Sequence, residues 1–144
     1  MADIEHLQSI RAPAAAVYAA LTTKAGLAAV WTDDLDVTPE VGAISSFRFG
    51  DDPPDRMRIT ELAEGRRQAW HCVSSIPEWV GTDITFDLEE KDGRTSVQLR
   101  HANWREVTDC FRSCNYHWGI FLYSLKLYCE TGTGLPYQAR AATL

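Results

Sequence analysis

Several residue patterns are missing from this sequence, and each absence excludes a class of function. The chain has 14 Lys and Arg against 20 Asp and Glu, which gives a net charge of −6 with no basic cluster. Binding to nucleic acid or to an anionic membrane needs such a cluster, so we expect neither partner. No apolar stretch approaches the roughly 20 residues of a membrane-spanning helix. A Gly-rich phosphate loop, G-x-S-x-G and H-E-x-x-H are also missing, which argues against familiar hydrolases and nucleotide-dependent enzymes.

We expect neither disulfide cross-links nor a secretory leader, and no flexible linker divides these 144 residues. The four cysteines, Cys72, Cys110, Cys114 and Cys129, lack the spacing of a disulfide framework. The N-terminus carries acidic residues where a secretory leader carries basic ones, so we expect reduced thiols and a cytoplasmic location. The 144 residues contain no internal repeat and no Gly/Ser/Pro-rich linker, which predicts one domain over residues 1–144.

The first part of the chain predicts one strand and two short helices. Residues 4–11 alternate loosely between apolar and polar side chains, as a strand does. Pro13 suits the start of a helix, which we place over residues 13–22. Thr23 can cap a second helix over residues 24–31, because its hydroxyl can accept from an N–H of the first turn.

The remainder predicts an antiparallel sheet followed by one long helix. Apolar residues from Phe47 onward alternate with polar ones, and Asp92-Gly93 is a strong signal for a two-residue hairpin. Between residues 107 and 131 apolar residues recur every three or four positions, which is typical of an amphipathic helix. Gly132 is expected to end it. This order of elements predicts an α+β fold in which the sheet wraps the last helix.

Several segments of the sequence resemble one protein superfamily. They are PAAAVYAALT (13–22), KAGL (24–27) with Trp31, HANW (101–104), WG (118–119), LYSLK (122–126) and ETG (130–132). In these segments the chain resembles the SRPBCC (START-like) superfamily, and in particular its heat-shock-protein-ATPase-activator-like branch. The resemblance implies a helix-grip fold: a curved antiparallel sheet around a long C-terminal helix, two short helices after the first strand, and a pocket between sheet and helix. Members bind lipids, hormones or polyketides, and some catalyse reactions on them.

The inner faces of the predicted strands and of the long helix converge on mostly aromatic side chains. Such a set is typical of an apolar ligand pocket, but the same side chains can instead fill a core completely. The candidate ligand-binding residues are Trp31, Phe47, Phe49, Met57, Trp70, Phe86, Leu99, His101, Trp104, Cys114, Trp118 and Phe121.

His101 is the polar member of this set. By strand parity it faces inward with Leu99, and Asn103 is expected to follow on the same face. A neutral imidazole there can contact a ligand or act as a base near pH 7. The alternative is a buried histidine bonded to a backbone carbonyl or to Asn103. No convincing second titratable group accompanies it, so no catalytic residue is assigned.

The predicted long helix carries two further patterns. Cys110, Cys114 and His117 are ligand types that zinc accepts, but they span roughly 10 Å of helix axis, so we expect no metal site. On another side of the helix, Tyr116, Ile120, Tyr123 and Leu127 form a second apolar stripe. We expect this stripe either to pack under the N-terminal strand and helices or to form the seam of a homodimer.

The sequence therefore favours a domain that binds a small hydrophobic or aromatic, lipid-like molecule in an internal cavity, without a cofactor. One alternative is an enzyme of the cyclase or dehydratase type acting on such a ligand. Another is a stress-response or chaperone-associated protein that acts through its surface.

Overall fold

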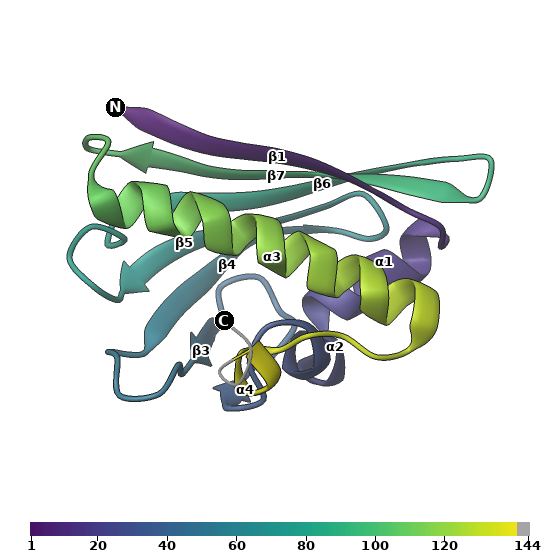
Figure 1. Cartoon of the computed structure of the whole chain (residues 1–144), viewed down its shortest axis with the longest axis horizontal. Helices are drawn as coiled ribbons and strands as arrows, with labels where there is room; N and C mark the ends of the chain where they lie inside the picture. Colours follow the sequence, from purple (N-terminus) through teal and green to yellow (C-terminus); the bar gives the residue numbers. More distant parts are fainter. Residues whose placement is uncertain (141–144) are drawn as a thin grey trace.

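The computed structural model of the chain describes residues 1–140, which form one antiparallel sheet and four helices (Figure 1). The strands are β1 (Ala2–Ile10), β2 (Leu35–Asp36), β3 (Ile44–Phe47), β4 (Asp55–Ala63), β5 (Arg67–Ser74), β6 (Asp83–Lys91) and β7 (Arg94–Trp104). The helices are α1 (Ala14–Thr22), α2 (Lys24–Val30), α3 (Asp109–Thr131) and α4 (Tyr137–Arg140).

The sheet is curved, and its strand order is β1-β7-β6-β5-β4-β3-β2. Helix α3 crosses one face of this sheet, and α1 and α2 lie near the C-terminal end of α3 (Figure 1). This is the helix-grip arrangement, and the predicted α+β fold is confirmed. No helix within residues 1–140 has the length and apolarity to cross a membrane.

Local chemistry explains where the helices begin and end. The Thr23 hydroxyl accepts from the Gly26 N–H at 3.1 Å, as predicted for the cap of α2. Helix α3 begins two residues later than predicted, because the Thr108 hydroxyl caps it by accepting from the Phe111 N–H at 3.2 Å. Gly132 ends α3 in the left-handed conformation with φ 88°, as expected.

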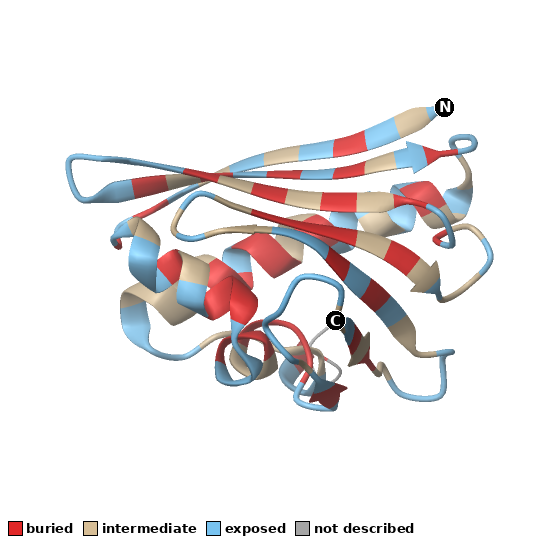
Figure 2. Ribbon diagram, turned by 180° about the vertical axis from the view of Figure 1, so that it is seen from behind, coloured by how far each residue is buried: buried red, intermediate tan, exposed pale blue. Residues whose placement is uncertain are grey.

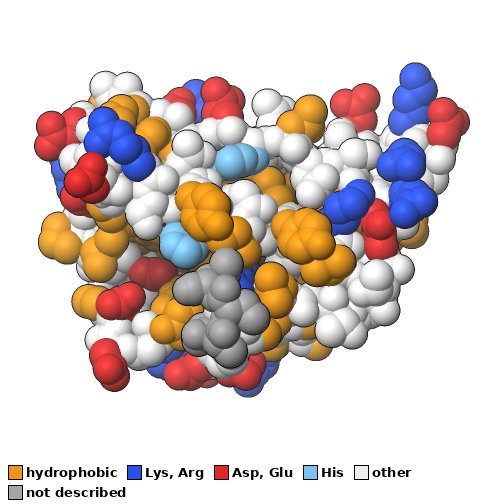
Figure 3. Space-filling view, viewed as in Figure 1, with side chains coloured by type: hydrophobic (Ala, Val, Ile, Leu, Met, Phe, Trp, Pro, Cys, Tyr) orange, Lys and Arg blue, Asp and Glu red, His pale blue; other side chains and the backbone are white. Residues whose placement is uncertain are grey.

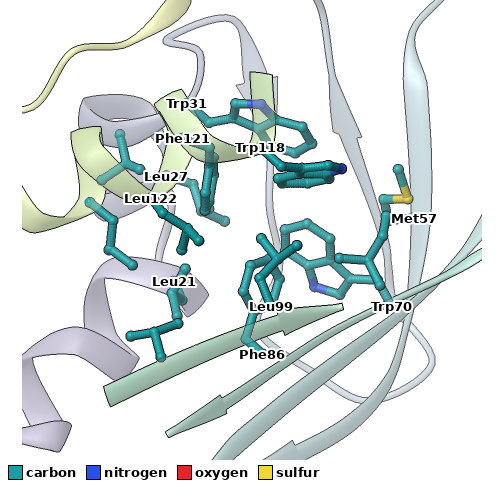
Figure 4. Close-up of a cluster of buried hydrophobic side chains, with 14 of the residues drawn as sticks. Leu21, Leu27, Trp31, Met57, Trp70, Phe86, Leu99, Trp118, Phe121 and Leu122 are labelled. Atoms are coloured by element: carbon teal, nitrogen blue, oxygen red, sulfur yellow. The ribbon is translucent and has the colours of Figure 1, made fainter. Parts of the chain in front are cut away.

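Buried and exposed residues alternate along the central strands, so one face of the sheet is dry (Figure 2). Onto this face α3 packs Trp118, Phe121, Leu122 and Leu125. Figure 4 shows the resulting cluster, in which indole and phenyl rings from the sheet and α3 meet the ring of Trp31, which follows α2. The ring centroids of Trp31 and Trp118 are 5.4 Å apart, a distance typical of packed aromatic pairs.

A bulge near the end of β7 corrects the predicted orientation of Asn103. Ile4 pairs with His101 whereas Ala2 pairs with Trp104, so β7 has one extra residue in this interval. Asn103 occupies it with φ 72° and is exposed, donating through Nδ2 to Asp83. After this extra residue the side chains of β7 alternate in the opposite phase, so Trp104 rather than Asn103 is buried.

Candidate ligand-binding site

The space between the sheet and the middle of α3 is filled by side chains. Nine of the predicted site residues are no more than 2% exposed and belong to the packed core. They are Phe47, Met57, Trp70, Phe86, Leu99, His101, Trp104, Trp118 and Phe121. The rings of Trp70 and Phe86 illustrate this packing, with centroids 5.1 Å apart in an edge-to-face arrangement. None of the nine lines the cavity described next.

A cavity of about 230 Å³ lies at the rim of this core. Three predicted residues line it: Trp31 after α2, Phe49 after β3, and Cys114 on α3. The other lining residues come from the β3–β4 and β5–β6 loops, the start of β4, α3 and α4. They are Asp52, Pro53, Asp55, Ile76, Trp79, His117, Tyr137 and Arg140.

Aromatic rings form the walls of this rim cavity. The ring centroids of Trp31 and Phe49 are 5.1 Å apart, and Phe49 meets Tyr137 edge to face at 5.5 Å. Tyr137 is held there because its backbone N–H donates to the Trp31 carbonyl at 2.7 Å. On another side, the Trp79 indole N–H donates to the Cys114 sulfur at 3.3 Å. Ring contacts and hydrogen bonds therefore hold these lining residues to one another.

His101 lies behind the rim cavity and supports one of its walls. The Trp118 indole N–H donates to Nδ1 of His101 at 3.0 Å, so Nδ1 is an acceptor and the proton of a neutral ring resides on Nε2. Nε2 is 2.7 Å from the Thr82 hydroxyl, which in turn donates to the Trp79 carbonyl at 2.6 Å. The partners of His101 are therefore Thr82 and Trp118, not Asn103 or a backbone carbonyl. Burial lowers the pKa of His101 to about 3, which keeps the imidazole neutral.

Asp55 is the polar residue of the site that the sequence analysis missed. It shares the inward parity of Met57 and Ile59 at the start of β4, and this parity was the available signal. Its carboxylate accepts from the Ser75 hydroxyl. Burial raises the pKa of Asp55 to about 6, against the lowering effect of that hydrogen bond.

Burial also shifts the pKa values of Cys114 and His117, which line the rim cavity. Burial raises the pKa of the Cys114 thiol to about 12 and lowers the pKa of His117, which lies on the same helix. The Arg140 guanidinium is buried and donates to the backbone carbonyls of Leu135 and Val30.

Trp79 and Tyr137 were also missed. Trp79 is only 8% exposed although it lies in a loop, a combination that strand and helix periodicity cannot detect. Tyr137 reaches the cavity because the chain turns back after Gly132, and no sequence pattern indicates that return.

A second hollow of about 620 Å³ lies on the outer side of α3 and is more open. Tyr116, Ile120 and Tyr123 of the predicted stripe line it, together with Gly119. Tyr116 is 64% exposed and Tyr123 is 52% exposed, whereas Leu127 is half-buried and lies outside it. Figure 3 shows hydrophobic side chains gathered on the face where α3 lies in Figure 1.

The cysteines Cys72, Cys110, Cys114 and Cys129 are all free thiols. In the part of the chain that the structure describes, no three His, Cys, Asp or Glu residues are placed to hold a metal ion together.

Residues 11–130 match the family model of the Activator of Hsp90 ATPase homolog 1-like proteins. The chain belongs to this family. The resemblance to the activator-like branch of the SRPBCC superfamily is thereby confirmed. No curated protein matches the chain significantly.

Solved structures of other proteins share the fold of this family member. One is the solution structure of the Aha1 dimer from Colwellia psychrerythraea, which is 37% identical with a TM-score of 0.87 over 93% of this chain and 100% of that chain. SSP2350 from Staphylococcus saprophyticus is 19% identical with a TM-score of 0.77, covering 92% and 95% of the two chains. DynU16, from the dynemicin biosynthetic locus, is also 19% identical with a TM-score of 0.77, covering 92% of this chain and 48% of that one. At 19% identity the last two show a common fold alone.

Proposed function

We propose that this protein binds a small aromatic or apolar molecule in the rim cavity. The observation that carries the proposal is the lining of that cavity, which combines the rings of Trp31, Phe49, Trp79 and Tyr137 with a few polar groups. Ligand sites combine mostly apolar walls with a small number of placed polar groups in this way.

The size of the rim cavity limits the ligand to about one ring. Drug-sized ligands occupy pockets of roughly 300–1,000 Å³, whereas a cavity of roughly 150 Å³ already holds benzene. The volume of about 230 Å³ lies between these values. A single substituted ring therefore suits it better than a lipid chain or a polycyclic polyketide.

Binding can be tested with 2-phenylethanol as the probe, measured by calorimetry and ligand-observed NMR. His117→Phe places a large side chain at the cavity lining and is expected to weaken binding by about tenfold or more. Ser113→Phe is the matched control, because Ser113 is exposed one turn earlier on α3 and lines no part of the cavity. Equal binding by both variants and the unchanged protein would place the probe elsewhere and refute the proposal.

A second proposal concerns the outer face of α3, where we infer that two copies of the chain associate. Tyr116 and Tyr123 are large apolar side chains more than half exposed beside an open hollow. Exposed apolar patches of this kind mark partner sites. The Colwellia psychrerythraea relative is described as a dimer, which supports a second copy as the occupant.

The dimer proposal predicts that Tyr123→Glu yields monomers in sedimentation or light-scattering measurements. The substitution replaces a large apolar side chain of the seam by a carboxylate that would have to lose its water there, which is unfavourable. Val41→Glu, at a loop position 62% exposed, is the control and should leave the mass unchanged. If the Tyr123 variant keeps the mass of the unchanged protein, the α3 face is not the seam.

The enzyme and chaperone-associated alternatives stay predictions. The first would use Asp55 and His117, since these titratable groups line the rim cavity and His101 does not. The second would use the same exposed face of α3 as the dimer seam.

A further inference from the structure

The charged groups of the rim cavity indicate the charge of its ligand, an inference that rests on the proposed function. Asp55 is half-buried, and the only hydrogen-bond partner of its carboxylate within residues 1–140 is the uncharged Ser75 hydroxyl. No Lys, Arg or His in these residues forms an ion pair with it. A carboxylate in such a place lacks the positive charge that buried acids normally have beside them.

The other charged groups around the cavity do not supply that charge. Asp52, in the loop that precedes β4, adds a second carboxylate and opposes ionisation of Asp55. From β5 and α3, Asp55 faces the thiols of Cys72 and Cys114. His117 has a lowered pKa and is neutral at pH 8. Arg140 lines the cavity too, but two of its donors are directed to the carbonyls of Val30 and Leu135.

The aromatic walls favour the same sign of ligand charge. Trp31 and Trp79 present indole rings to the cavity, and Tyr137 adds a phenol ring. The faces of such rings attract cations, most strongly where water is excluded. The carboxylates and the aromatic rings of the lining thus favour the same kind of ligand.

We propose that the ligand of the rim cavity is a small organic cation, with an aromatic or apolar body and an ammonium group that pairs with Asp55. The ring of the ligand packs against the aromatic walls, and the ammonium group donates to the Asp55 carboxylate. Binding of a cation favours the ionised carboxylate, so affinity is greatest above the pKa of Asp55 and falls as Asp55 is protonated.

The test compares three probes of one size: 2-phenylethylamine, 2-phenylethanol and phenylacetate, titrated by calorimetry at pH 8 and pH 5. A primary ammonium stays charged over this range. At pH 8 the amine is expected to bind about tenfold more tightly than the alcohol, and at pH 5 this advantage should largely disappear. Asp55→Asn should remove the advantage at pH 8, whereas Glu40→Gln, an exposed loop carboxylate, should keep it.

Each other outcome overturns the inference. If the alcohol binds and the amine has no advantage at pH 8, the cavity takes aromatic molecules but not cations, and only this inference fails. Tighter binding of phenylacetate would assign the recognition to Arg140 and reject the cation. If none of the three probes binds, the proposed function fails together with the inference. The pH profile of the unchanged protein decides the matter even if the Asp55 variant does not fold.

Discussion

His101 and Asp55 both face the inside of the protein, and burial shifts their pKa values in opposite directions. The pKa of His101 falls from 6.5 to about 3, and that of Asp55 rises from 3.8 to about 6. Between about pH 4 and pH 6, His101 is protonated in the unfolded chain but not in the native protein. Over the same range, Asp55 is protonated in the native protein but not in the unfolded chain. The two residues therefore give opposing dependences of stability on pH.

His101→Ala is expected to lower the free energy of unfolding by about 3 kcal/mol at pH 7.5, because Trp118 and Thr82 lose their partner and a cavity opens. Below pH 6.5 this deficit should shrink by about 1 kcal/mol per pH unit, since the stability from a depressed histidine pKa is lost as pH falls. Urea denaturation at pH 7.5, 6 and 5 measures it. His71→Ala, at a half-buried histidine bonded to Asp83, is the control. A deficit that is independent of pH would contradict the neutral buried imidazole.

Asp55→Asn is expected to stabilise the protein by about 1–2 kcal/mol at pH 8. A raised carboxyl pKa costs stability as pH rises from 3.8 to about 6, and the neutral amide avoids this cost while keeping an acceptor for Ser75. The gain should vanish at pH 4 and below. Denaturation of both proteins across this range, with Glu40→Gln as the unaffected control, provides the measurement. A variant that is less stable at pH 8 would show that the ionised form is already compensated.

At the scale of the elements, the sequence predicted what local chemistry determines. The cap at Thr23 and the end of α3 at Gly132 are confirmed, as is the Asp92-Gly93 hairpin, where both residues have positive φ. Each depends on the conformational preferences of a few neighbouring residues. The bulge at Asn103 was missed, because a bulge shows only in the pairing of β7 with the distant strand β1.

The joint between α1 and α2 depends on a close approach that only glycine permits. A Cβ atom at Gly26 would lie 2.4 Å from the Ala20 carbonyl oxygen, which belongs to the backbone and cannot move aside cheaply. We expect Gly26→Ala to destabilise the protein by about 2 kcal/mol. Gly119→Ala on α3 is the control, since its Cβ would make only an ordinary contact of 3.7 Å with His6. Thermal denaturation at equal concentrations compares the two, and equal midpoints would refute the steric argument.

At the scale of the whole molecule, sequence periodicity located the core but not the rim cavity. Strand and helix parity identified side chains such as Trp70 and Phe86, which are buried. The cavity forms where two loops, α3 and the returning C-terminal segment meet, so its position depends on the path of the chain between elements. That path leaves no periodic signal, which is why Trp79 and Tyr137 were found only in the structure.

The rim cavity and the outer hollow of α3 share no lining residue, although both border the same helix. We therefore expect the two proposed activities to be separable. Tyr123→Glu should abolish association and leave the affinity for 2-phenylethanol within about twofold, whereas His117→Phe should weaken the affinity and leave association unchanged. Their effects should add in the double variant, measured by light scattering and calorimetry. If Tyr123→Glu also abolishes ligand binding while the fold is intact by circular dichroism, the cavity requires the second copy, and the two surfaces act as one site.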